Sequence, residues 1–194
     1  KFFCIMICMK KIILASQSPR RKELLEKCNI PFTQDPANID ETIDSTLPLT
    51  QTIQQLSKRK ALAVLQRHKD AIVIGSDTIV VLHNEVLGKP HTKQEAYQML
   101  NKLQGNTHEV ITGIAFVSNQ RTYTNVSVSK VTFSKMSDDE IEKYILTGEY
   151  KDKAGAYGIQ GYGGRYISHI DGDYYAIMGL PLNLVYEELK NIGL

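Results

Sequence analysis

Two arginines in the first turn of a predicted helix are the strongest candidates for phosphate binding. The segment Ser16-Gln-Ser-Pro-Arg-Arg21 follows a short apolar run, and its proline favours a helix start. A helix N-terminus has unpaired backbone N–H groups and the positive end of the helix dipole, and both attract anions. Arg20 and Arg21 have the wrong charge for that dipole, so they destabilise the helix unless an anion binds. The segment predicts an anion site, with two ordinary surface arginines as the alternative.

Two lysines extend this candidate site. Lys60 lies four residues after Leu56 and three before Ala63, so it shares the inward stripe of its predicted helix. A lysine there must extend to solvent, form an ion pair or line a pocket, and the spacing leaves these readings open. Lys89 follows a strand in Gly88-Lys89-Pro90, where the proline restrains its backbone. Lys89 can therefore direct a fixed ammonium group at phosphate, although a lysine in a turn more commonly has no such role.

Acidic residues provide the chemistry that cations alone lack. Asp77 follows a predicted apolar strand, and Gly75 and Ser76 leave room beside it for a ligand. Carboxylates at strand ends bind metals or activate water, while an aspartate in a turn is the alternative. Glu41 is a second acid, but nothing in the spacing connects it with Asp77.

A glycine-rich segment from Gly155 to Gly164 is the candidate for base recognition. The pattern Gly155-x-x-Gly158-x-x-Gly161 has neither the preceding strand nor the following helix of a dinucleotide fingerprint, and the chain has no Walker-type segment. We interpret it as a loop in which the Gln160 amide reads a base edge. His108 is a catalytic candidate, although a lone strand histidine is more often structural. Four tyrosines are candidates for stacking on a base, although packing in the core or at the rim is the commoner role: Tyr157, Tyr162, Tyr174 and Tyr175.

Composition predicts one soluble domain. The chain has 194 residues, of which 42% are hydrophobic and 23% are charged. The net charge of +2 is too small to indicate binding to nucleic acid or a membrane. Its three cysteines form no CxxC pair, which favours a reducing compartment and therefore the cytoplasm.

The apolar segment 1–8 is too short to span a bilayer, because it stops at Lys10 and Lys11. We predict that residues 1–8 are an extension upstream of a natural start at Met9, and that residues 9–194 form a single domain. The basic clusters, including Lys58-Arg59 and the pair Lys151 and Lys153, are typical of solvated surfaces.

The predicted elements mix strand–helix units with hairpins, so we expect one α/β domain around a mixed sheet. Capping boxes are expected at Thr92–Glu95 and Ser137–Glu140. The expected strands are 11–15, 71–74, 79–82, 86–87, 109–118, 121–134, 165–170 and 173–178, and the expected helices begin at Pro19, Thr50, Thr92, Ser137 and Pro181.

Several segments of the chain together resemble the Maf family, and they follow the family's order from about Met9 to the C-terminus. Any one of these segments is a weak signal, whereas their ordered combination is highly specific. They are Leu14-Ala-Ser-Gln-Ser-Pro-Arg-Arg21, Gly75-Ser-Asp-Thr78, Leu87-Gly-Lys-Pro90, Thr107-His-Glu-Val-Ile-Thr-Gly113, Lys153-Ala-Gly-Ala-Tyr-Gly-Ile-Gln-Gly161 and Gly179-Leu-Pro-Leu182.

This resemblance implies an elongated α/β fold similar to that of inosine triphosphate pyrophosphatases, with an active-site cleft between two lobes. It implies Mg²⁺- or Mn²⁺-dependent hydrolysis of a nucleoside triphosphate between its α and β phosphates. Asp77 would accept the proton of the attacking water and contact the metal, and Glu41 would help to place the metal. The triphosphate would be held by Ser16, Arg20, Arg21, Lys60 and Lys89.

Substrate choice is implied by three positions. Arg20, Thr78 and Gln160 resemble the branch of the family that acts on dTTP and UTP, whereas the 7-methyl-GTP branch tends to have an aromatic residue, Gln and Glu there. A neutral amide donates and accepts hydrogen bonds, which suits a uracil or thymine edge, including that of a modified pyrimidine nucleotide. The segment before Met9 and the positive charge of Lys58-Arg59 depart from the family pattern.

Two other functions compete with hydrolysis. The family has been linked to arrest of septum formation, so a nucleotide-binding regulator without turnover is one alternative. A phosphotransferase would need an acceptor site, and no motif for one is visible. We favour a hydrolase with a house-cleaning role, because water needs only Asp77 and the metal. The resemblance also implies a homodimer.

Overall fold

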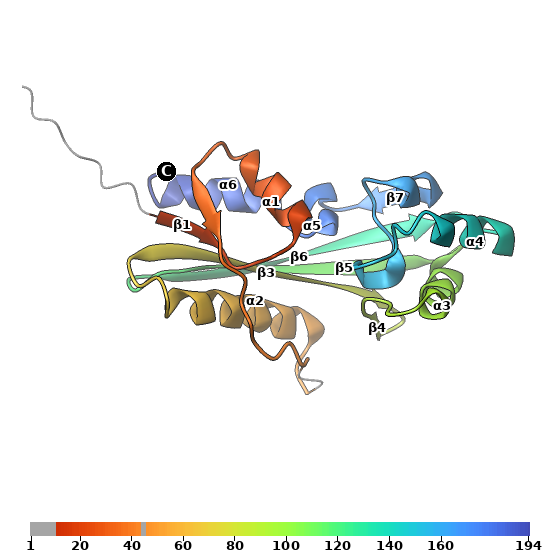
Figure 1. The fold of residues 1–194 in the computed structure, drawn as a ribbon, viewed down its shortest axis with the longest axis horizontal. Coiled ribbons are helices and arrows are strands. Elements are labelled where there is room, and N and C mark those ends of the chain that lie inside the picture. Colours follow the sequence, from red (N-terminus) through yellow and green to blue (C-terminus); the bar gives the residue numbers. More distant parts are fainter. Residues whose placement is uncertain (1–10, 44–45) are drawn as a thin grey trace, which may run out of the picture.

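A long mixed β-sheet forms the middle layer of the computed structural model, which describes residues 11–43 and 46–194 (Figure 1). The predicted extension 1–8 lies outside these described residues. The strand order is β2-β1-β3-β5-β6-β7, and β4 pairs with β3. β1 runs parallel to β2 and β3, and the other pairs are antiparallel. The strands are β1 Lys11–Leu14, β2 Phe32–Gln34, β3 Ala71–Leu82, β4 Glu85–Leu87, β5 Thr107–Val117, β6 Thr122–Phe133 and β7 Ile167–Asp171.

Helices cover both faces of this sheet. α2 lies against one face, and α1, α5 and α6 lie on the other (Figure 1). The helices are α1 Pro19–Glu26, α2 Leu49–Leu65, α3 Lys93–Leu103, α4 Asp138–Leu146, α5 Tyr174–Met178 and α6 Leu182–Asn191, and the 3₁₀ helices are η1 Ala154–Ala156 and η2 Tyr162–Tyr166.

Three long strands give the molecule two lobes. β3 and β6 have 12 residues each and β5 has 11, which corresponds to about 40 Å at the usual rise per residue. Their ends extend beyond α2 and carry α3, α4, β4 and β7 as a second lobe (Figure 1). The mixed, elongated fold predicted from the sequence is therefore confirmed.

A gap in the sheet edge separates the lobes. β1 pairs with β3 as far as Ile74, and β4 begins to pair with β3 at Val80. Between these points, within the described part of the chain, β3 pairs only with β5. Asp77 lies in this gap, in the middle of a continuous strand. The prediction that Asp77 follows the end of one strand and precedes another was wrong, because β5 pairs with β3 along the whole segment.

Close packing of α2 on the sheet fixes the position of Lys60. A Cβ atom at Gly75 would lie 2.2 Å from the Ser57 carbonyl oxygen, and one at Gly113 would lie 2.6 Å from the Ile53 carbonyl oxygen. Both glycines therefore allow the helix backbone to approach the strands. Lys60 follows Ser57 by almost one turn, so the same approach brings its side chain over β3.

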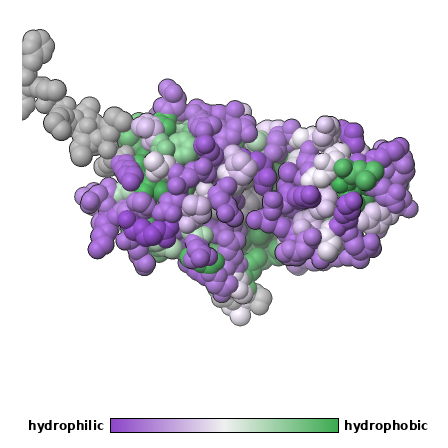
Figure 2. Space-filling model, viewed as in Figure 1, coloured by the Kyte–Doolittle hydropathy of each residue, from purple (hydrophilic) through white to green (hydrophobic). Residues whose placement is uncertain are grey.

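The hydrophobic core has a part on each side of the sheet. Ile13, Val64 and Val73 belong to a buried cluster under α2, while the larger cluster includes Leu24, Leu100 and other residues of the opposite face and second lobe. No described helix has both the length and the apolar character needed to cross a membrane. Figure 2 shows a mostly hydrophilic face with hydrophobic residues in small patches.

Two details differ from the expected elements. The segment predicted as a second strand of a hairpin, 173–178, is instead α5, since the Asp173 side chain accepts hydrogen bonds from two N–H groups of its first turn. Gly179 ends α5 in the left-handed conformation. β2 was not predicted, and its three residues carry little periodic signal.

Helix ends were predicted more successfully. Ser137 and Glu140 form the expected capping box at the start of α4. At α3, Thr92 accepts the Glu95 N–H, whereas the Glu95 carboxylate accepts the His91 N–H, so only half of that box forms.

Candidate active site

A cavity of about 1030 Å³ opens at the gap in the sheet edge. Its walls come from the start of α1, the segment before α2, the middle of β3, the turn after β4 and the glycine-rich segment. The two lobes thus contribute opposite walls. All the site residues that the resemblance to the Maf family implies line this cavity: Ser16, Arg20, Arg21, Glu41, Lys60, Asp77, Thr78, Lys89 and Gln160.

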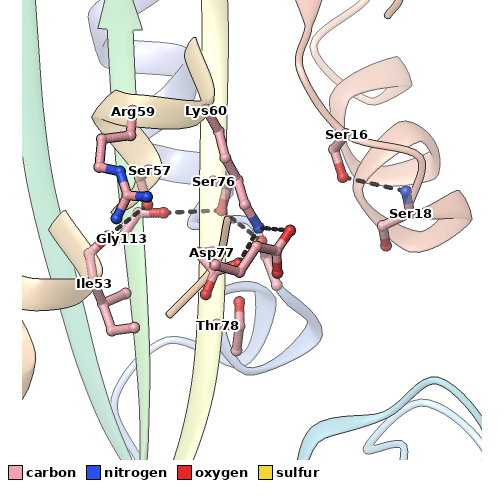
Figure 3. A network of polar contacts seen from close by, with 12 residues as sticks. Ser16, Ser18, Ile53, Ser57, Arg59, Lys60, Ser76, Asp77, Thr78 and Gly113 are labelled. Carbon is pink, nitrogen blue, oxygen red and sulfur yellow. Dashed lines mark hydrogen bonds and ion pairs between the residues drawn. The ribbon is translucent and has the colours of Figure 1, made fainter. Parts of the chain in front are cut away.

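Lys60 joins two carboxylates in a cluster that we call the acid–lysine cluster (Glu41, Lys60 and Asp77). Its Nζ lies 2.5 Å from Oδ1 of Asp77 and 2.9 Å from Oε1 of Glu41. Figure 3 shows Lys60 extending from α2 toward Asp77 on β3. Lys60 is 6% exposed, so among the alternatives left open by the sequence it forms ion pairs and also lines a pocket. The cluster also connects Glu41 with Asp77, which spacing alone does not predict.

The donor set of this cluster fits a divalent metal. Oxygens of both acids lie within hydrogen-bonding distance of one ammonium nitrogen, so they are close enough to bind one cation. Mg²⁺ sites commonly use one or two carboxylates and take their remaining ligands from phosphates and water. The described residues contain no group of three or more His, Cys, Asp or Glu side chains that could hold a metal by itself. Glu41 and Asp77 therefore suit a metal that arrives with a phosphate ligand.

Arg21 is half-buried on the other face of β3. Its guanidinium donates to the Gly179 carbonyl at 2.8 Å, to Oγ1 of Thr78 at 3.1 Å and to Oγ of Ser16 at 3.3 Å. Burial lowers the pKa of Arg21, and the charge of Asp77 opposes that change. All three acceptors are neutral, so these bonds orient the guanidinium without cancelling its charge. Two of its five N–H groups are left for an anion.

Strand alternation explains why neighbouring residues serve different walls. Side chains of successive strand residues point to opposite faces. Asp77 therefore faces Lys60 of α2, whereas Thr78 faces Arg21 of α1 and also lies 3.0 Å from the Thr112 hydroxyl.

Further cations surround the cavity. Arg20 donates to the Asp152 carbonyl at 3.3 Å, and burial lowers its pKa while Asp152 raises it. Burial, followed by the charge of Arg20, lowers the pKa of Lys153. Lys89 is exposed on the second lobe, and no carboxylate of the described chain lies within ion-pair distance of it.

Lys151 and Lys153 also line the cavity, although sequence reasoning placed them on a solvated surface. The signal that would have found Lys153 is its position at the head of a segment shared with the Maf family. Their positive charge adds to the anion site, which explains why the cavity wall is so strongly cationic.

His108 does not line the cavity. It is 1% exposed, its Nε2 lies 2.7 Å from the Tyr157 hydroxyl, and burial lowers its pKa to about 4. A neutral histidine packed on Phe133 and Tyr157 is structural, which was the commoner of the two interpretations. Tyr157 is buried and lines the cavity, while Tyr162, Tyr174 and Tyr175 are exposed elsewhere.

Comparisons with known proteins identify relatives along nearly the whole chain. The family described as "Maf-like protein" matches residues 11–192. A protein named dTTP/UTP pyrophosphatase from Halalkalibacterium halodurans is 49% identical over 185 residues, which are 95% of this chain and 97% of the relative. Another of that name, from Bacillus cytotoxicus, is 47% identical over 182 residues, 94% of this chain and 95% of the relative.

A solved structure shares the fold at low sequence identity. The Staphylococcus aureus Ham1 protein superposes with a TM-score of 0.53 and 16% identity, over 94% of this chain and all of that one (100%). At that identity the likeness concerns the fold alone.

Proposed function

Because this chain belongs to the Maf family, we propose that it hydrolyses dTTP and UTP to the nucleoside monophosphate and pyrophosphate. The relatives named dTTP/UTP pyrophosphatase support this substrate class. The observation that carries the proposal is the acid–lysine cluster, in which Lys60 bridges Asp77 and Glu41 inside a cationic cavity. Acids that can hold a cation, surrounded by basic groups, suit the phosphoanhydride bond of a triphosphate.

Glu41 and Asp77 are the residues that would hold Mg²⁺ or Mn²⁺. When bound, the metal would neutralise charge on the phosphate oxygens. Lys60 contacts only Oδ1 of Asp77, which leaves Oδ2 to accept a proton from the attacking water. A carboxylate placed beside the reacting phosphorus is a suitable general base.

The cations of the two lobes would bind the triphosphate from opposite sides. Arg20 lies in the first turn of α1, with the neutral Ser16 just before the helix, while Lys89 and Lys153 approach from the second lobe. Negative charge grows on the leaving pyrophosphate, so positive groups fixed in advance lower the barrier. Arg21 would orient Ser16 and Thr78 and direct its remaining N–H groups at phosphate.

The pyrimidine preference would depend on Arg20, Thr78 and Gln160. The Gln160 side chain is exposed on the cavity wall, so its amide is free to meet a base edge. The Thr78 hydroxyl is hydrogen-bonded to Arg21 and Thr112. Thr78 would therefore contribute to base preference through the shape of the site. A preference for 7-methyl-GTP is the competing specificity within the same chemistry.

A panel of nucleoside triphosphates with Mg²⁺ or Mn²⁺ tests the proposal through release of pyrophosphate. We expect dTTP and UTP to turn over fastest, with strict dependence on the metal. Binding of nucleotides without turnover would favour the regulator alternative, with its link to septum formation. Fastest turnover of 7-methyl-GTP would replace the specificity and leave the reaction intact. A cytoplasmic homodimer is the assembly we expect, and sedimentation of the purified protein tests the dimer.

A further inference from the structure

We propose that Glu149 is a positioning residue for base recognition, because its carboxylate holds the segment 158–163 in the conformation that presents Gln160 to the cavity. This inference rests on the proposed function. Glu149 itself does not line the cavity, so it would act only through the loop.

The Glu149 carboxylate accepts hydrogen bonds from two backbone N–H groups of this loop. Oε2 of Glu149 accepts the Tyr162 N–H at 2.7 Å, and Oε1 accepts the Gly163 N–H at 3.0 Å. The Tyr144 hydroxyl also donates to Oε1, at 3.0 Å. Backbone N–H groups at the start of the short helix η2 have no partners within that helix, so an external acceptor satisfies them. Glu149 therefore anchors the loop directly after Gln160.

The Tyr144 hydroxyl extends the anchor to the other side of Gln160. It accepts the Gly158 N–H at 3.3 Å while it donates to Glu149. Burial, together with the charge of Glu149, raises the pKa of Tyr144 above its usual range, so the hydroxyl keeps its proton. Gly158 and Gly163 are thus attached to the buried Tyr144 and the half-buried Glu149, and Gln160 lies between these attachment points.

The carboxylate occupies the space that a side chain at Gly161 would take. A Cβ atom at Gly161 would lie 2.1 Å from Oε2 of Glu149. A side chain at the position that follows Gln160 would therefore displace the carboxylate from its hydrogen bonds to the loop.

Glu149 also reaches the phosphate side of the cavity. Its carbonyl oxygen accepts a hydrogen bond from Nζ of Lys153 at 2.5 Å, and Lys153 lines the cavity. This bond uses the main chain of Glu149, so replacing the side chain should not remove it. The charge of the Glu149 side chain also acts on Lys153, but two monophosphates share the same phosphate, so this effect cancels in the ratio of their affinities.

The decisive variant is Glu149→Gln. The amide keeps the size of the side chain, but its NH₂ group would face an N–H donor of the loop in place of an acceptor oxygen. We expect the loop to loosen and Gln160 to lose its fixed position. Thymidine monophosphate should lose affinity relative to cytidine monophosphate by about 10-fold, the effect of about one hydrogen bond.

Calorimetry with these two monophosphates measures that preference without requiring turnover. The set comprises the wild type, E149Q, Q160A and the double variant E149Q/Q160A. If Glu149 acts through Gln160, the E149Q change should reduce the preference in the wild type and have little further effect in Q160A. An equal reduction in both backgrounds, or an unchanged preference in E149Q, would overturn the proposal.

The matched control is Glu188→Gln. Glu188 is more deeply buried than Glu149, at 2% exposure, and it pairs with Arg121 away from the cavity. Its variant should lose stability and keep the monophosphate preference, which separates positioning from folding. If E149Q does not fold, Tyr144→Phe removes the hydroxyl bridge alone and should reduce the preference by a smaller factor.

The two proposals fail in different ways. If the wild type binds thymidine monophosphate more tightly than cytidine monophosphate but releases no pyrophosphate, the proposed hydrolysis is contradicted. The test of Glu149 is still valid in that case. A wild-type protein without any monophosphate preference would overturn the role of Glu149 whatever its turnover.

Discussion

The acid–lysine cluster and the loop around Gln160 occupy opposite parts of one cavity and are held in different ways. Asp77 and Lys60 lie on the middle of β3 and on α2, where strand pairing and close helix packing fix both backbones, and Glu41 joins them from the segment before α2. The loop around Gln160 has little regular structure and depends on hydrogen bonds to Glu149 and Tyr144. Reaction chemistry is thus tied to the fold itself, whereas base recognition is tied to a few replaceable bonds. Substrate preference should therefore be easier to change by mutation than turnover.

Asp77→Asn tests the reaction side of this comparison and should have the largest effect. Loss of a general base reduces rates by about 10²–10⁴-fold, so we expect the turnover of dTTP to fall within that range. The asparagine keeps the size of the side chain, and the monophosphate preference should stay unchanged. Pyrophosphate release and monophosphate calorimetry measure the two quantities separately.

The control for this variant is Asp139→Asn, on the exposed surface of α4, where the acid pairs with Lys143. It should keep wild-type turnover. An Asp77→Asn protein with full activity would mean that another group accepts the proton.

Lys60→Met breaks the centre of the acid–lysine cluster and should have the next largest effect. Removing one cation that stabilises growing charge costs about 10²–10³-fold in rate. Without the ammonium group, Glu41 and Asp77 face each other with no cation, so the free protein should bind Mn²⁺ more tightly. Electron paramagnetic resonance of Mn²⁺ without nucleotide measures this change independently of turnover.

Lys143→Met is the matched control, since Lys143 is exposed and its removal should affect neither rate nor metal. Weaker Mn²⁺ binding in Lys60→Met would contradict the view that the lysine and the metal share these two acids.

The reaction side was also the more predictable part of the site. Helical spacing placed Lys60 on the inward stripe of α2, and a chemically suitable acid was visible at Asp77. The continuity of β3 was not visible, because Gly75 and Ser76 look like a strand end until β5 is known to pair beside them. The link between Glu41 and Asp77 required the fold, because no sequence period relates a loop residue to a strand residue.

The loop side was predictable only in part. The glycines and Gln160 indicated a loop with an exposed amide, and that expectation agrees with the cavity wall. Glu149 had no signal, since the backbone N–H groups that it satisfies are not encoded by residue type. The same ambiguity affected 173–178, where a short apolar run fits a strand or a helix until its cap residue is placed.

Gly75→Ala tests whether helix packing holds the cluster. The new methyl group would meet the Ser57 carbonyl oxygen of α2, a rigid neighbour, so α2 must move. Overpacking of this kind costs about 1–3 kcal/mol of unfolding free energy. Because Lys60 moves with α2, turnover should also fall, by about 10-fold.

Chemical denaturation and pyrophosphate release measure both effects. Gly88→Ala is the control for stability, because a Cβ atom there meets no atom of the described residues within 4 Å. If Gly75→Ala lost stability with unchanged turnover, the packing of α2 would not determine the position of Lys60.

Low pH should destabilise the part of the protein next to the loop around Gln160, through protonation of His108. This is the smallest of the predicted effects. Burial lowers the pKa of His108 from 6.5 to about 4, so the folded protein keeps this ring neutral. The unfolded chain binds a proton near pH 6.5, and between pH 6.5 and 4 it therefore binds more protons than the folded chain. Stability from the neutral ring is complete above pH 6.5 and is lost as the pH falls toward 4. At pH 5 the loss is about 1–2 kcal/mol.

His108→Gln removes this titration, so its unfolding free energy should change less between pH 7.5 and pH 5 than that of the wild type. His91→Gln, at an exposed position, should retain the full wild-type dependence. His108 contacts Tyr157 at 2.7 Å, and Tyr157 lies in the glycine-rich segment just before Gly158. Amide hydrogen exchange at pH 5 should therefore increase around Gly158 before it increases in β3. Equal increases in both places would show that the two sides of the cavity unfold as one unit, and the contrast between a rigid reaction side and an adjustable base side would not hold.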